Sequence, residues 1–139
     1  MPVTVQWDDD AHTIIYFRLT APWSWDDYEH GDQQVRALLD SVNHTVDIIL
    51  DFASMGMLPL NSFPYIRRAA IDIHPNQGMV AILGINAFLR MLGNAMEAVY
   101  PQIATTRRPA ASKEEAYRMI AQARAARVNP RHSAWPPGG

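Results

Sequence analysis

The chain of 139 residues contains no cysteine, which excludes a disulfide framework, a thiolate metal site and a cysteine nucleophile. No apolar run approaches the ~20 residues that span a bilayer, and residues 1–4 show neither the basic nor the apolar region of a signal peptide. We therefore expect a cytoplasmic protein with no membrane partner. What the chain does contain, 48% hydrophobic and 19% charged residues, is the ordinary composition of one globular domain.

The motifs of common catalytic sites are absent as well. The chain has no G-x-S-x-G nucleophile elbow, no P-loop and no G-x-G-x-x-G dinucleotide motif. Its five histidines share no metal-ligand spacing with one another or with the carboxylates. Its arginines do not line up with aromatic residues as they do in nucleic-acid interfaces. We expect no catalytic residues, no metal, no other cofactor and no nucleic-acid partner.

Charge is divided unevenly along the chain. Residues 1–51 hold ten of the fourteen acidic residues but only two of the twelve basic ones. Two interpretations are open: the two signs form opposite faces that steer a partner or pair between protomers, or folding interleaves the halves and removes the contrast.

The first part of the chain predicts a hairpin followed by a helix. Residues 3–7 alternate between apolar and polar side chains, and residues 13–19 are rich in β-branched and aromatic ones. An acidic turn joins the two segments, which favours two antiparallel strands. Ser24, with Asp27 three residues later, resembles a capping box. We expect the helix that it opens to run to about Ser41.

The middle of the chain predicts two buried strands that alternate with helices. Residues 46–52 and 79–84 are short, nearly continuous apolar runs, typical of parallel strands covered on both faces. Residues 62–73 have helical spacing, and the following helix, capped by Asn86, extends to Tyr100.

The last part predicts one more strand and one more helix. Residues 103–106 form a weaker strand pattern, and Ser112 with Glu115 forms a capping box that opens the final helix. Residues 129–139 are rich in proline and glycine, so we expect a disordered tail after a single domain of residues 1–128.

Together these elements predict an α/β fold with a mixed, mostly parallel sheet of about five strands and about four helices, in which an N-terminal hairpin precedes four β-α units. The strand ends that lead into helices gather at one edge of such a sheet, where helix amino termini offer free amides. This edge is a candidate site for a small apolar or anionic ligand, or its polar groups only cap helices and contact solvent. The candidate ligand-binding residues are Trp23, Asn86, Arg107 and Arg108.

The connector of residues 53–60 is unusually apolar for a loop. It either folds under the edge of the sheet or presents an apolar lip to a partner, a role that suits its adaptable methionines.

The order of elements resembles that of the STAS superfamily of anti-sigma-factor antagonists, and more closely its SpoIIAA-like branch. The resemblance covers about residues 3–127. It rests on the initial hairpin, the aromatic start of the first helix at residues 23–28, the strand at 46–52 and the Ser-x-x-Glu start of the last helix at 112–115.

The resemblance implies a non-catalytic regulatory or interaction module. It would bind a protein partner, such as a regulatory kinase or an anti-sigma factor, or a second copy of itself, through the connector and helix of residues 53–73. Partner-switch members are phosphorylated on a serine in an Asp-Ser-Ser-Gly turn. The corresponding residues 59–64 lack the aspartate and the glycine, which leaves Ser62 as a loose match and a candidate phosphorylation site. In the simpler interpretation, Ser62 or Asn61 only caps the helix that follows. The alternative is a carrier or sensor of a small molecule or anion at the strand edge. The expected partner-binding residues are Met55, Met57, Leu58, Leu60, Asn61, Ser62 and Tyr65.

Overall fold

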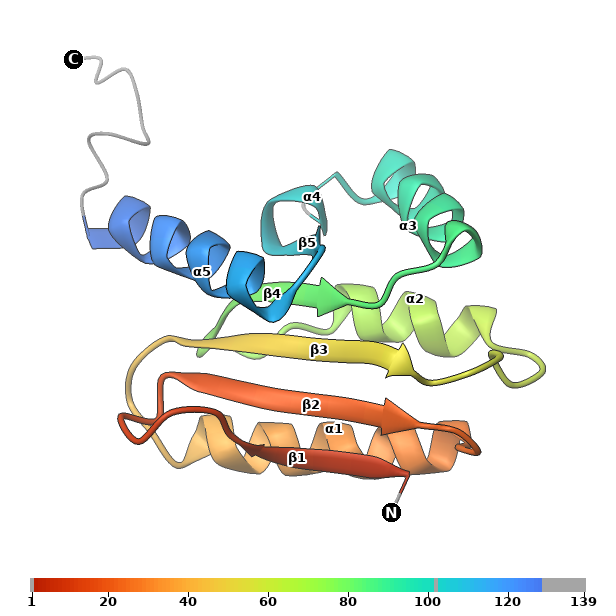
Figure 1. Ribbon diagram of the computed structural model, residues 1–139, viewed down its shortest axis with the longest axis horizontal. Helices are drawn as coiled ribbons and strands as arrows, with labels where there is room; N and C mark the ends of the chain where they lie inside the picture. The colour runs from red at the N-terminus through yellow and green to blue at the C-terminus, as the bar shows by residue number, and fades with distance from the viewer. Residues whose placement is uncertain (1, 102, 129–139) are drawn as a thin grey trace.

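The structure is a computed structural model that describes residues 2–101 and 103–128, and within them five strands form one sheet (Figure 1). The strands are β1 (Val3–Trp7), β2 (Ile14–Thr20), β3 (Val46–Ser54), β4 (Gln77–Leu83) and β5 (Arg107–Ala110). They lie side by side in chain order. β1 is antiparallel to β2, and each later strand is parallel to the one before it. The predicted α/β fold with a mixed, mostly parallel sheet is confirmed.

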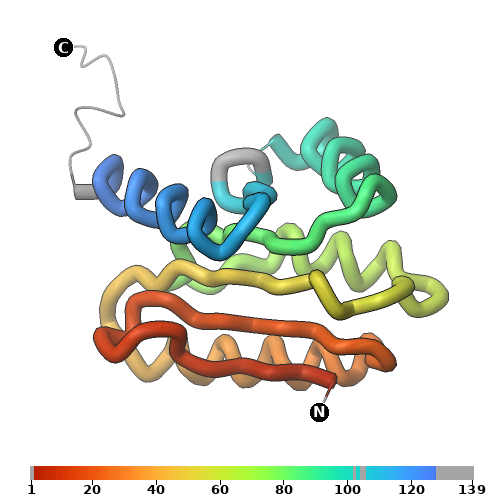
Figure 2. Tube along the Cα trace, viewed as in Figure 1, coloured from red at the N-terminus to blue at the C-terminus, as the bar shows by residue number. Residues whose placement is uncertain are grey.

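Helices cover the two faces of this sheet unequally. They are α1 (Trp25–Asp40), α2 (Phe63–Ile71), α3 (Ala87–Val99), the short α4 (Ile103–Thr106) and α5 (Lys113–Val128). α1, α2 and α3 lie on one face and α5 crosses the other (Figure 1), and Figure 2 shows the same path as a tube. The second helix ends two residues before the predicted residue 73.

Each face of the sheet has its own core. Ile15 packs with Leu39 of α1 in the larger core, and Ile49 packs with Ile120 of α5 in the smaller one. Because successive side chains of a strand point to opposite faces, a strand that helices cover on both sides needs apolar residues at nearly every position. This requirement explains the nearly continuous apolar run at residues 46–52.

Side-chain caps begin three of the helices where the sequence predicts them. Ser24 and Asp27 form the complete capping box of α1. The side chain of Asn86 accepts a hydrogen bond at the start of α3, and Ser112 Oγ accepts one at the start of α5. The Glu115 carboxylate departs from the box pattern, because it accepts from the amide of the residue before the cap.

The last strand lies four residues later than predicted. Residues 103–106 form the helix α4, and β5 begins at Arg107, which pairs in register with Val80. Ile103 is buried against α2 and α3, so its hydrophobicity serves helix packing. A short apolar run does not distinguish a buried helical turn from a strand. Pro109 is tolerated because β5 is an edge strand.

Folding brings the acidic first part of the chain against the basic second part. Asp47 is 0% exposed and pairs with Arg124 and Arg127 of α5, each at 2.9 Å. Lys113 pairs with Asp8 at 3.2 Å. Ion pairs therefore cross between the two halves, as expected if folding interleaves them.

No helix within residues 2–101 and 103–128 is both long and apolar enough to cross a bilayer. The predicted disordered tail, residues 129–139, lies outside the described residues.

Candidate functional site

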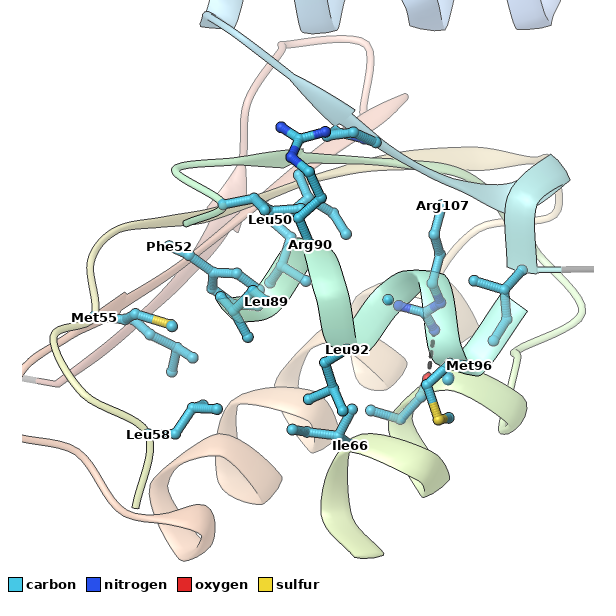
Figure 3. A pocket seen from close by; sticks show the side chains of 18 of the residues that line it. Leu50, Phe52, Met55, Leu58, Ile66, Leu89, Arg90, Leu92, Met96 and Arg107 are labelled. Carbon is cyan, nitrogen blue, oxygen red and sulfur yellow. Dashed lines mark hydrogen bonds between the residues drawn. The ribbon is translucent and has the colours of Figure 1, made fainter. Parts of the chain in front are cut away.

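An apolar cavity of about 190 Å³ lies between the sheet and helices α1, α2 and α3. Leu50 and Ile82 line it from the sheet, Ile66 from α2, and Leu92 and Met96 from α3 (Figure 3). Met96 is the one residue of α3 that is fully buried. The space remains open because α3 covers the sheet without packing closely against it.

Two tryptophans tie the connector to the start of α1, where they form one wall of the cavity. Trp23 Nε1 donates a hydrogen bond to the carbonyl oxygen of Met55 at 2.8 Å, and Trp25 Nε1 donates to Ser62 Oγ at 2.9 Å. The Trp25 ring also stacks on Tyr65 of α2, with ring centroids 5.0 Å apart. These contacts place aromatic faces and the connector at the same end of the cavity.

Arg107 is the cationic group at the other end of the cavity (Figure 3). Its Nη2 donates a hydrogen bond to the carbonyl oxygen of Ala69 on α2. Its Nε is buried and has no hydrogen-bond partner among the described residues. Arg107 also forms no ion pair with any carboxylate in the part of the chain that the structure describes. Among the described residues, the half-buried Arg107 side chain therefore has a buried Nε without an acceptor and no carboxylate paired with its charge.

Burial and two neighbouring groups influence the pKa of the Arg107 guanidinium. Burial lowers the pKa of its guanidinium, whereas Tyr28 and Asp32 raise it. An arginine side chain stays protonated in proteins, so the charge is retained. Asp32 does not neutralise it, because its carboxylate already pairs with Arg36 at 3.0 Å. Burial raises the pKa of Tyr28 to about 12, so this phenol lines the cavity as a neutral hydrogen-bond donor.

An apolar groove of about 570 Å³ continues from the cavity to the surface, between the connector and the first turns of α3. Cavity and groove share Met55, Leu58, Ile66, Leu89 and Leu92. A rim of large exposed hydrophobic residues surrounds the groove. This exposed rim consists of Met57 and Leu60 of the connector, Phe63 at the start of α2 and Phe88 of α3.

The structure separates the predicted partner-binding residues into exposed and covered ones. Met57 and Leu60 are 91% and 89% exposed, and Asn61 is also exposed, whereas Leu58 and Tyr65 are half-buried. Met55 is 3% exposed and lies at the base of the groove, so its contact with a partner stays a prediction. Its backbone turns inward because its amide bonds to Phe52 and its carbonyl oxygen accepts from a tryptophan. The connector thus both folds under the sheet edge and presents an apolar lip.

Ser62 does not cap α2, contrary to the prediction. It occupies the N-cap position, directly before Phe63, but its hydroxyl makes no capping bond there. The hydroxyl instead donates to the carbonyl oxygen of Pro59 and accepts from Trp25. Phosphorylation of Ser62 stays a prediction, and it would remove the hydroxyl proton that Ser62 donates to Pro59.

The predicted ligand site at the strand edge is not assembled as expected. Trp23 and Arg107 do line one cavity, but Asn86 lies in the groove and its side chain is used as the cap of α3. Arg108 lies on the opposite face of β5 from Arg107, because successive strand residues alternate. The prediction placed both arginines after a strand at residues 103–106, whereas they are the first two residues of β5.

The sequence reasoning missed most residues that line the cavity, among them Tyr28, Ile66, Leu92 and Met96. A usable signal was present in residues 87–99, which carry more apolar residues than one buried helical stripe needs. That excess is now explained, because α3 faces the cavity with one side and solvent with another.

The described residues contain no group of three or more His, Cys, Asp or Glu side chains that could hold a metal ion. The resemblance to STAS domains stays a prediction that rests on the order of elements. Comparisons of the chain with protein-family models, with curated proteins and with solved structures find no match.

Proposed function

We propose that this protein is a non-catalytic binding domain that takes up a small, mostly apolar molecule in the cavity between the sheet and α1, α2 and α3. The observation that carries the proposal is the apolar cavity of about 190 Å³. Ligand sites in proteins are concave and mostly apolar, with a few polar groups that orient the ligand. An engineered apolar cavity of about 150 Å³ already binds benzene, so a cavity of this size accommodates an organic ligand.

The loose packing of α3 supplies a route into the cavity. Met96 is the only fully buried residue of this helix, and Gly93 has no atom within 4 Å of the position a Cβ would take. Segments with few buried apolar contacts open at low free-energy cost. An outward movement of α3 would join the cavity to the groove and admit a ligand.

Binding of the neutral dye Nile red, followed by its fluorescence, tests the proposal. Ala70→Leu places three more carbon atoms in the cavity, and Ala125→Leu makes the same change at an exposed position of α5. We expect saturable binding that Ala70→Leu weakens roughly tenfold, the loss of about 1.4 kcal/mol that steric overlap typically causes. Ala125→Leu should bind as the wild type does. Absence of saturable binding, or equal weakening by both variants, would refute the proposal.

A second function is favoured by the exposed rim, and it corresponds to the interaction role that the STAS resemblance implies. Met57, Leu60 and Phe88 are large and more than half exposed, and none of the described residues that line the groove is charged. Exposed apolar patches commonly mark interaction sites. We infer that the rim binds a second copy of the chain, because an uncharged apolar patch meets its own symmetry-related copy without charge repulsion.

Light scattering after size-exclusion chromatography tests this second function. The wild type should form a dimer, and the double variant Met57→Asp/Leu60→Asp should be a monomer. Val99→Asp, at an exposed apolar position of α3 outside the rim, is the matched control and should remain dimeric. A monomeric wild type across the accessible concentration range would eliminate self-association through the rim.

A further inference from the structure

We propose that the cavity selects an amphipathic monoanion, a molecule with an apolar body and one carboxylate head group, and that Arg107 binds the head group. This inference rests on the proposed function, because it specifies the class of ligand that the same cavity takes up.

The first argument is the incomplete pairing of Arg107. Its Nη2 bonds to the carbonyl oxygen of Ala69, but its Nε is buried without a partner. Buried polar groups are nearly always hydrogen-bonded, and a buried charge without a counter-charge is costly. A guanidinium presents its nitrogens in a planar arrangement that fits a carboxylate through two parallel hydrogen bonds. A bound carboxylate would supply both the missing acceptor and the missing charge.

The second argument is that no carboxylate of the described residues takes this role. Asp32 pairs with Arg36 at 3.0 Å. Glu97 is the only acidic residue that lines the cavity, and it forms no ion pair with Arg107. Arg18 also has a buried Nε without a partner, but it does not line the cavity, and its Nη2 donates to Ser54 Oγ at 2.8 Å.

The third argument is the balance of charge. Arg107, Arg90 and Glu97 are the charged residues that line the cavity, so its lining carries a net charge of +1. One negative charge neutralises this lining, whereas a phosphate monoester brings close to two at neutral pH and would leave an excess charge buried. Tyr28 lines the same cavity and interacts electrostatically with Arg107. Because this phenol stays protonated, it can donate a hydrogen bond to a carboxylate oxygen that Arg107 already contacts, and it adds no further charge.

The shape of the cavity gives the ligand a direction. Figure 3 shows Arg107 at one end, and Met55 and Leu58 at the other, with Ile66 and Leu92 between them. A head group on Arg107 therefore directs the apolar body between α2 and α3 toward the groove. An unbranched alkyl chain fits this path, which makes medium-chain carboxylates suitable probes.

The test compares decanoate with decan-1-ol, which has the same chain length and no charge, by isothermal titration calorimetry. We expect the wild type to bind decanoate more tightly than decan-1-ol by roughly tenfold or more, because hydrogen bonds to charged groups are stronger than those between neutral groups. Decyl phosphate, as a third ligand, should bind more weakly than decanoate.

Three variants complete the design. Arg107→Met keeps a long apolar stem and should bring the affinity ratio of decanoate to decan-1-ol close to one. Arg107→Lys keeps the charge without the planar guanidinium and should give an intermediate ratio. Arg108→Gln removes the neighbouring charge on the opposite face of β5 and should leave the ratio as in the wild type. Thermal unfolding of each variant shows that it is folded.

The outcomes separate this inference from the proposed function. If Nile red and decan-1-ol bind but decanoate gains nothing from Arg107, the head-group assignment is wrong and the apolar binding site stands. If decyl phosphate binds more tightly than decanoate, the assignment to a monoanion is wrong. If none of these ligands binds to the folded wild type, the proposed function itself fails.

Discussion

Asp47 offers a quantitative test of how α5 is held on the sheet. Its carboxylate is 0% exposed. It accepts hydrogen bonds from the Met79 amide at 2.8 Å and from Arg124 and Arg127, each at 2.9 Å. We predict that Asp47→Ala lowers the free energy of unfolding by about 2–5 kcal/mol, because it removes every one of these bonds at once.

The expected loss has two parts. The Met79 amide would remain buried without an acceptor, which costs about 1–3 kcal/mol. The two arginine side chains are each 36% exposed, so water partly replaces the carboxylate around them. Their lost pairing therefore adds only about 0.5–1 kcal/mol each. Because domains are typically stable by about 5–15 kcal/mol, the total is a large share of the stability.

Urea unfolding, followed by tryptophan fluorescence and by circular dichroism, measures this loss. Asp47→Asn keeps an acceptor for the Met79 amide and should lie between the wild type and Asp47→Ala. Asp10→Ala, an exposed position in the hairpin turn, is the control and should change stability by no more than about 0.5 kcal/mol. If Asp47→Ala unfolds at the same urea concentration as Asp10→Ala, the cluster makes no net contribution and the reasoning is refuted.

Four further predictions concern single positions. Gly84→Ala should cost at least about 1 kcal/mol, because Gly84 has φ +75° and a Cβ there would clash with the backbone of Ala53. Gly93→Ala should instead raise the free energy of unfolding by about 0.5–1 kcal/mol, since no atom outside its own helix lies within 4 Å of its Cβ position. If the thermal unfolding midpoints of Gly84→Ala and Gly93→Ala shift in the same direction, both predictions are contradicted. Ser24→Ala should lower stability by about 1 kcal/mol through loss of the α1 cap, and unchanged amide exchange in the first turn of α1 would count against it. Burial raises the pKa of Tyr28 to about 12 from about 10 in the unfolded chain. Its contribution to stability is therefore complete below pH 10 and is lost as the pH rises toward 12. The free energy of unfolding, measured by urea unfolding at several pH values, should fall less steeply with pH in Tyr28→Phe than in the wild type, and identical profiles would disprove the prediction.

Local sequence signals predicted most of the fold. Ser24, Asn86 and Ser112 cap the helices that they were expected to cap, because a cap depends on residues within one helical turn. The strands at residues 46–54 and 77–83 were recognisable because strands covered on both faces are apolar at consecutive positions. These signals need no knowledge of distant parts of the chain.

The site could not be predicted in the same way, because long-range packing determines it. Ile103 has the character of a strand residue, and only its burial against α2 and α3 shows that it belongs to a helix. Because the strand begins four residues later than predicted, Arg107 belongs to the strand and does not follow its end. Its side chain therefore lines the cavity. The burial of Met55 likewise depends on a tryptophan 32 residues away in sequence. A cavity is a space that side chains from many segments leave open, so no single segment encodes it.

The strictly sequential order of the five strands decides where such a site can form. Open parallel sheets commonly bind ligands at the point where the strand order reverses and adjacent crossovers diverge to opposite faces. Here every crossover advances in one direction, so the crevice produced by a reversal does not arise. Three consecutive crossover helices instead share one face of the sheet, and the last of them, α3, has only one buried residue. Proteins with this winding should therefore hold their ligands beneath a helix, and lengthening or shortening that helix offers a direct means to alter which molecules they accept.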